Sequence, residues 1–160
     1  DVCSSDLVLF RSDLSDLHTS WVISGTRTVP WPVPSSDLQA LLAEINRLSS
    51  PGEKLLVGPR DLRFANHNDT FLYFLLPQLV PATRYLEMNP GVANRQDSGL
   101  AQDIARADWL VLNSGYDNSH EPNASMIPGS SLPNDIVLSN FCVLSRHSHW
   151  ELLRRCTASH

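Results

Sequence analysis

The stretch ADWLVLNSGYD, residues 107–117, places four consecutive apolar residues directly before a run of polar and turn-forming ones. A short apolar run bounded in this way is typical of a strand that is covered on both faces, as in a parallel sheet. The stretch KLLVG at residues 54–58 has the same character, and RYLEM at residues 84–88 is expected to form a further strand.

Helical patterns separate these expected strands. Residues 36–48 carry leucine and isoleucine at helical spacing after a serine that can cap the first turn. A second helix is expected from residue 71, capped by Asn68 or Asp69, and a third from residue 100. Strands that alternate with helices form βαβ units. We therefore predict a small three-layer, Rossmann-like α/β domain with a short, mainly parallel sheet.

The C-terminal part predicts an antiparallel hairpin. Residues 141–145 and 150–154 flank a polar turn at residues 146–149, and residues 135–140 are expected to form a helical turn before it.

Two cysteines lie at the ends of this hairpin. If the turn centres on residues 147–148, Cys142 faces Leu153, and Cys156 lies three residues further along. A disulfide then requires a bulge or a curled end, because bridged Cα atoms lie within about 7 Å of each other. The pair Cys142–Cys156 is a candidate disulfide, and the sequence leaves both the bridged and the reduced states open.

The chain divides into four parts. Residues 1–17, DVCSSDLVLFRSDLSDL, resemble a translated sequencing adapter of the kind carried into metagenomic assemblies, so we expect them to be an artefact or disordered. Residues 18–35 are expected to form an extended lead-in, in which residues 20–25 are either a strand or an extended segment and the stretch VPWPVPSS that follows is Pro-rich. Residues 36–156 form the single α/β domain, and residues 157–160 form a tail.

Composition excludes some function classes. The 160 residues carry a net charge of −5, which argues against binding to a nucleic-acid backbone. The longest apolar run, Phe71 to Leu76, is far shorter than the roughly 20 residues of a membrane-spanning helix. Neither a metal-ligand spacing nor a phosphate-binding or dinucleotide fingerprint is present, so we expect no metal and no cofactor.

Polar residues gather where the expected strands end. In open parallel sheets, ligands bind beyond the carboxyl ends of the strands, and a set of Arg, Asp, Glu and Asn side chains there can hydrogen-bond a sugar or a phosphate. The candidate ligand-binding residues are Arg60, Asp61, Arg63, Asn68, Glu87, Asn89, Asn94, Tyr116, Asp117 and Glu121.

The alternative is that these residues are structural. Asp69 then caps a helix, and Arg60, Asp61 and Glu87 form ion pairs that tie the loops together. No G-x-S-x-G motif occurs, and proximity of Ser114 to His120 in sequence is weak evidence for a catalytic triad. The catalytic residues, if any exist, stay unknown.

A family resemblance rests on four long segments of the sequence. They are residues 57–79, VGPRDLRFANHNDTFLYFLLPQL; residues 81–104, PATRYLEMNPGVANRQDSGLAQDI; residues 107–125, which include ADWLVLNSGYD and EPNAS; and residues 141–156, FCVLSRHSHWELLRRC. They resemble the C-terminal soluble region of uncharacterised, mostly actinobacterial, polytopic membrane proteins, which are similar to GT-C type glycosyltransferases. The resemblance implies an extracytoplasmic domain at the cell membrane, with its own transmembrane region as a partner. It also implies transfer of a lipid-linked sugar by the whole protein. The catalytic acid of GT-C enzymes lies between early membrane helices, so no catalytic residue is carried over.

Three hypotheses follow. The first is an accessory domain of a glycosyltransferase-like membrane protein that binds a ligand, a sugar or lipid-linked sugar, or a partner, and is not catalytic in isolation. The second is a free-standing small hydrolase or transferase, which requires a deep pocket where at least two of Asp61, Glu87, Asp117 and Glu121 converge with an arginine. The third is a structural domain that packs on its membrane portion through an exposed apolar patch near Trp21 and Trp31.

Overall fold

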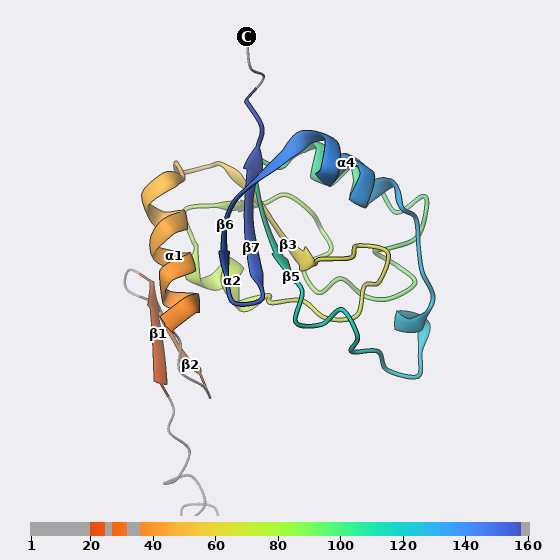
Figure 1. Ribbon diagram of the computed structural model, residues 1–160, viewed down its shortest axis with the longest axis horizontal. Helices are drawn as coiled ribbons and strands as arrows, with labels where there is room; N and C mark the ends of the chain where they lie inside the picture. The colour runs from red at the N-terminus through yellow and green to blue at the C-terminus, as the bar shows by residue number, and fades with distance from the viewer. Residues whose placement is uncertain (1–19, 25–26, 32–35, 158–160) are drawn as a thin grey trace, which may run out of the picture.

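The computed structural model describes residues 20–24, 27–31 and 36–157, and of residues 20–23 and 28–31 it describes the backbone. Its centre is a mixed five-stranded sheet in the order β4-β3-β5-β7-β6 (Figure 1). The strands are β4 (Val80–Pro81), β3 (Lys54–Pro59), β5 (Trp109–Asn113), β7 (Trp150–Arg155) and β6 (Phe141–His147). β4, β3 and β5 run parallel, whereas β7 and β6 are antiparallel to their neighbours. The chain is therefore an α/β protein, as the sequence predicts.

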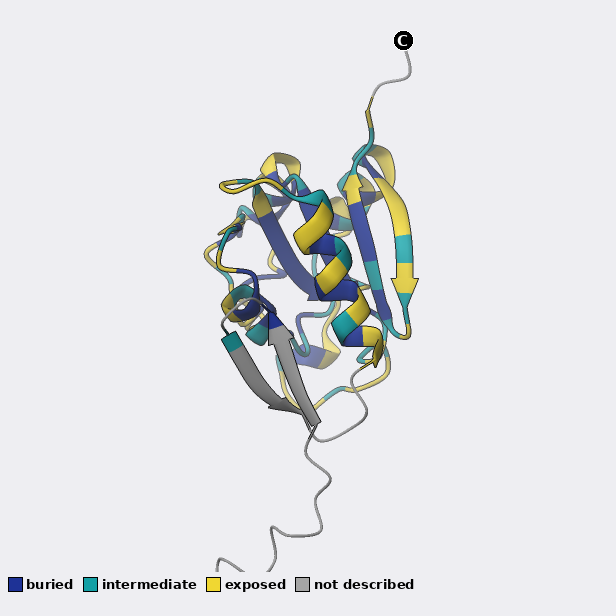
Figure 2. Ribbon diagram, turned by 90° about the vertical axis from the view of Figure 1, so that its left-hand side faces the viewer, coloured by how far each residue is buried: buried dark blue, intermediate teal, exposed yellow. Residues whose placement is uncertain are grey.

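Helices cover both faces of this sheet. α1 (Ser36–Leu48) and α2 (Phe71–Leu75) pack on one face, and α3 (Leu100–Arg106) and α4 (Leu132–Asn140) on the other. A 3-10 turn, η1 (Ala124–Met126), lies in the loop between β5 and α4. Figure 2 shows α1 exposed on its outer side and the strand beneath it buried.

Alternation along the central strands creates two separate cores. Val57 and Val111 face the leucines of α1, while Leu56 and Leu110 face α3 and α4. All five residues of β5 are buried, which explains why its first four residues are all apolar.

The prediction of a strand at residues 84–88 is wrong. These residues form turns, and β4 lies a few positions earlier, at Val80–Pro81. The Thr83 hydroxyl accepts a hydrogen bond from the Tyr85 amide at 3.1 Å and turns the chain away from the sheet. Leu86 and Glu87 are exposed, so these residues belong to a loop.

Parts of the lead-in form strands, and for residues 20–24 a strand is one of the two forms that the sequence allows. β1 (Ser20–Ser24) and β2 (Arg27–Trp31) pair as an antiparallel two-stranded sheet, separate from the central one. The prediction that residues 1–17 derive from adapter sequence lies outside the described residues, as do the side chains of Trp21 and Trp31.

The C-terminal hairpin has the expected bulge. β6 and β7 pair with a register shift between Val143 and Ser145, so that Cys142 lies opposite Arg154 instead of Leu153. A disulfide joins Cys142 to Cys156 across a Cα–Cα distance of 5.2 Å. The predicted helical turn before the hairpin is the full helix α4. In the described part of the chain, no helix has the length and apolar character needed to cross a bilayer.

Candidate functional site

The site lies where β3 and β5 end side by side. Pro59 pairs with Asn113 at the last step of the parallel ladder, and the Arg60 amide donates to the Asn113 carbonyl at 2.9 Å. α2, which follows β3, packs on one face of the sheet, and α4, which follows β5, packs on the other. Connections that leave a sheet in opposite directions open a crevice between the strands, where open α/β proteins bind ligands.

A buried carboxylate lies beside the ends of these two strands. Asp69 is 3% exposed, and its Oδ2 accepts hydrogen bonds from Asn113 Nδ2 at 2.5 Å and Trp150 Nε1 at 2.6 Å. Its Oδ1 accepts from the Tyr116 hydroxyl at 3.0 Å. Three donors from β5, β7 and the loop after β5 therefore converge on one side chain, and they tie that loop to the start of α2.

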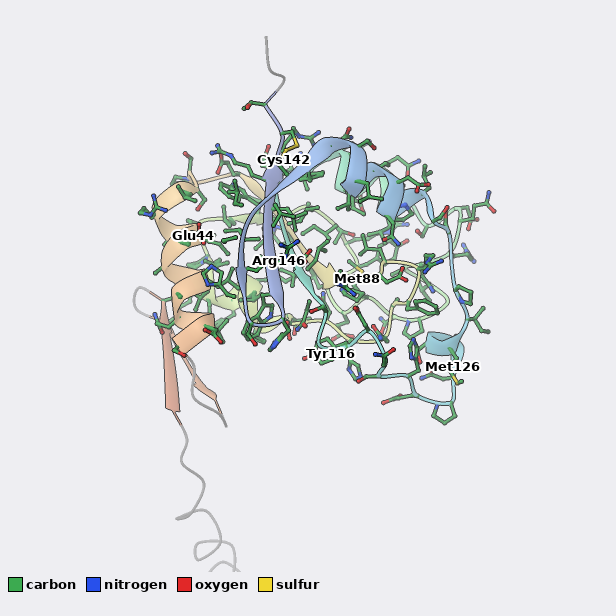
Figure 3. All side chains as sticks on the ribbon, in the orientation of Figure 1. Glu44, Met88, Tyr116, Met126, Cys142 and Arg146 are labelled. Atoms are coloured by element: carbon green, nitrogen blue, oxygen red, sulfur yellow. A yellow bond between two sulfur atoms is a disulfide. The ribbon has the colours of Figure 1, made fainter. Side chains whose placement is uncertain are left out.

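Tyr116 is held as a hydrogen-bond donor in this network. Burial, together with the negative charge of Asp69 and the hydrogen bond to it, raises the pKa of Tyr116 to about 12. The ring of His67 lies 4.8 Å from the ring of Tyr116, and Asn66 Nδ2 donates to the Tyr116 carbonyl at 2.5 Å. Tyr116 lies in the loop below the end of β5, whereas Cys142 lies near the opposite end of the sheet (Figure 3).

Two ion pairs form the exposed rim. Arg60 Nη2 donates to Asp117 Oδ2 at 2.5 Å, so the loops after β3 and β5 meet as predicted. Asp61 binds Arg63 at 2.6 Å and accepts from Asn134 of α4 at 2.8 Å.

Arg63 sets the acidity of Asp61. The hydrogen bond from the Arg63 guanidinium, with further hydrogen bonds from Asn134 and the Arg63 amide, lowers the pKa of Asp61 from 3.8 to about 2. The stability that the pair supplies is therefore complete above pH 3.8 and is lost as the pH falls through about 2.

Arg63→Gln is expected to raise the pKa of Asp61 from about 2 toward 3.8, because the largest cause of the depression is removed. A carboxyl-carbon NMR titration of the wild type and the variant measures this shift. Arg95→Gln is the matched control, since Arg95 pairs with Asp97 in another loop. An Asp61 pKa that stays near 2 in Arg63→Gln would contradict the assignment.

The other predicted residues take no part in these two ion pairs. Asn68 donates to the Leu86 carbonyl at 2.5 Å, and buried Asn94 donates to the Arg63 carbonyl at 2.8 Å, so both hold loops together. Glu87 and Asn89 are exposed in the loop that was predicted as a strand end. Glu121 is also exposed, and its Oε2 accepts from Asn123 at 3.2 Å.

Sequence reasoning missed the centre of the site. Asp69 was expected to cap α2, but the N-cap residue is Thr70, without a side-chain cap bond, and the Asp69 carboxylate points to Asn113 and Trp150 instead. The one sequence signal was the position of Asn113 directly after an apolar strand, where a buried amide needs a partner.

Two of the hollows on the described surface have the volume of a small-molecule site. One, of about 410 Å³, lies between residues 91–96 and residues 124–130. The other, of about 370 Å³, lies between α4 and the β6–β7 hairpin and reaches Arg60. Neither is lined by Asp61, Glu87, Asp117 or Glu121, so neither has the converging carboxylates that the hydrolase hypothesis requires. Among the described residues, no three His, Cys, Asp or Glu side chains are grouped to hold a metal ion.

Comparisons with family models, with curated proteins and with solved structures find no match to this chain. The resemblance to membrane glycosyltransferase-like proteins therefore stays a prediction.

Proposed function

We propose that this chain is an extracytoplasmic accessory domain of a glycosyltransferase-like integral membrane protein, and that it binds a ligand carrying a sugar and a phosphate without transforming it. The arrangement is Rossmann-like in this proposal, because β4, β3 and β5 follow the order in which a doubly wound sheet reverses direction. The ligand lies at the reversal point, against Arg60 and Asp117.

The Arg60–Asp117 pair carries the proposal. Asp117 Oδ2 is bound to Arg60, but Asp117 Oδ1 is buried without a hydrogen-bond partner among the described residues. A buried acceptor without a donor is destabilising, and a ligand hydroxyl would supply the missing donor. The Arg60 side chain is 54% exposed and has further N–H groups for a phosphate.

The acidic groups favour binding over catalysis. Asp69 is committed to three donors, and Asp61 is committed to Arg63 and Asn134. A general base or nucleophile needs a carboxylate within reach of the substrate, and these carboxylates already serve as acceptors in the fold. The Cys142–Cys156 disulfide supports the extracytoplasmic side, since disulfides persist in oxidising compartments.

Binding of glucose 1-phosphate to the full chain, measured by calorimetry, tests the ligand class. We expect Arg60→Gln to weaken binding at least tenfold, because a charge-assisted hydrogen bond contributes about 1.5–3 kcal/mol. Arg106→Gln is the control and should bind like the wild type. Arg106 ends α3, before the start of β5, whereas the site lies at the carboxyl end of that strand. Equal affinity of the two variants would contradict the site.

Two further results would contradict the proposal. Release of phosphate or glucose by the chain, abolished in Arg60→Gln, would make it an enzyme. A natural upstream reading frame that encodes no membrane spans would contradict the proposal that this domain belongs to an integral membrane protein.

A further inference from the structure

An apolar groove runs beside the proposed ligand site. Leu112 and Leu153 form its floor on the sheet, and Val137 and Leu138 of α4 form one wall. Val143 of β6 lies on the other side. The volume of about 370 Å³ is at the lower end of small-molecule sites.

The groove is charged at one end and apolar at the other. The strand registers place Arg146 opposite Glu151 and Glu151 opposite Leu112, beside the carboxyl end of β5, where Arg60 also lies. Moving along β7 away from this end, the next residue on the same face is Leu153, opposite Val143. A ligand lying along β7 would thus have its charge at one end only.

The apolar part is open to solvent. Leu138 is 82% exposed and Val143 is 42% exposed, although both lie beside buried Leu153. Exposed aliphatic side chains gathered around a hollow are typical of a binding groove. At the charged end, Arg60 and Arg146 are each bound to a carboxylate and are 54% and 66% exposed, so they keep N–H groups for an anion.

We propose that this groove binds an amphiphile, with the hydrocarbon chain along Leu112, Leu153 and Val143 and the anionic head group between Arg60 and Arg146. The proposal rests on the proposed function, because Arg60 belongs to both sites and the head group would be the phosphate of that ligand. The charged end selects an amphiphile over a fully apolar partner: hydrocarbon there would displace the water that solvates the exposed guanidinium groups of Arg60 and Arg146, which is unfavourable even though each is paired with a carboxylate. A phosphorylated alkyl chain satisfies both ends of the groove.

A series of n-alkyl phosphates tests the proposal, measured by calorimetry below the concentration at which each probe forms micelles. Each methylene added from butyl to octyl phosphate should tighten binding about fourfold, which is about 0.8 kcal/mol converted at 1.4 kcal/mol per factor of ten. The gain should stop once the chain fills the groove. Affinity that does not depend on chain length would overturn the proposal.

Two matched variants locate the hydrocarbon chain. Val143→Ser should reduce the affinity for octyl phosphate about tenfold, and Leu144→Ser should leave it unchanged, because both residues are exposed on β6 and only Val143 lines the groove. Leu138→Ser is a second groove variant on the surface of α4. Equal losses in Val143→Ser and Leu144→Ser would overturn the assignment.

The head group separates this inference from the proposed function. If glucose 1-phosphate binds through Arg60 and chain length has no effect, the proposed function stands and the groove does not bind hydrocarbon. If octyl phosphate binds through Val143 but Arg60→Gln and Arg146→Gln do not weaken it, the groove is a hydrocarbon site and the anionic head group is wrong. Self-association of the chain that is abolished by Val143→Ser, without probe binding, would identify a second copy as the occupant.

Discussion

Replacing Asp69 by alanine is expected to lower the free energy of unfolding by about 4 kcal/mol. The substitution leaves the indole N–H of Trp150 and the amide of Asn113 buried without an acceptor, and each unsatisfied buried donor costs about 1–3 kcal/mol. The Tyr116 hydroxyl, which is partly buried, loses its acceptor as well. Urea unfolding at pH 7, followed by far-UV circular dichroism, measures the loss.

Asp97→Ala is the matched control for this experiment. Its carboxylate accepts from Arg95 at 2.6 Å, but the Asp97 side chain is 74% exposed, so its removal should change the free energy of unfolding by less than about 0.5 kcal/mol. A loss below about 1 kcal/mol for Asp69→Ala would show that the buried network does not stabilise the fold. The proposal that Asp69 serves as a structural acceptor and not as a catalytic carboxylate would then be weakened.

Removing the disulfide is expected to destabilise the chain by about 3 kcal/mol. The bond joins residues that are 14 positions apart, and closing a loop of about 15 residues restricts the unfolded chain by roughly that amount. The double variant Cys142→Ser/Cys156→Ser avoids leaving one free thiol in the hairpin. Urea unfolding of the wild type and the double variant measures the difference.

A reductant distinguishes the bond from the side chains that form it. Dithiothreitol should lower the unfolding midpoint of the wild type to near that of the double variant, and it should leave the midpoint of the double variant unchanged. A wild-type midpoint that does not respond to reductant, together with a double variant of equal stability, would show that Cys142 and Cys156 are not bridged in solution.

The candidate site was predicted only in part. Arg60 and Asp117 meet because each follows a strand that can be recognised in the sequence by its apolar run. Neighbouring parallel strands end at the same edge of the sheet. Glu87 does not join them, because the segment 84–88, in which it was expected to end a strand, is a loop held by the Thr83 hydroxyl. Nothing in the local pattern of residues 84–88 distinguishes these two outcomes, since short segments with a few apolar residues also occur in loops.

The sequence by itself determined the local elements of this protein. The helix at residues 36–48, the buried strands that begin at Lys54 and Trp109, and the closing hairpin follow from the spacing of apolar residues within each segment. Only the tertiary structure decided the partners of the polar side chains. Asp69 has the sequence position of a helix cap, yet its acceptors face donors 44 and 81 residues away. Hydrogen bonds across such separations depend on how the sheet and helices pack, and no local pattern of residues records that packing.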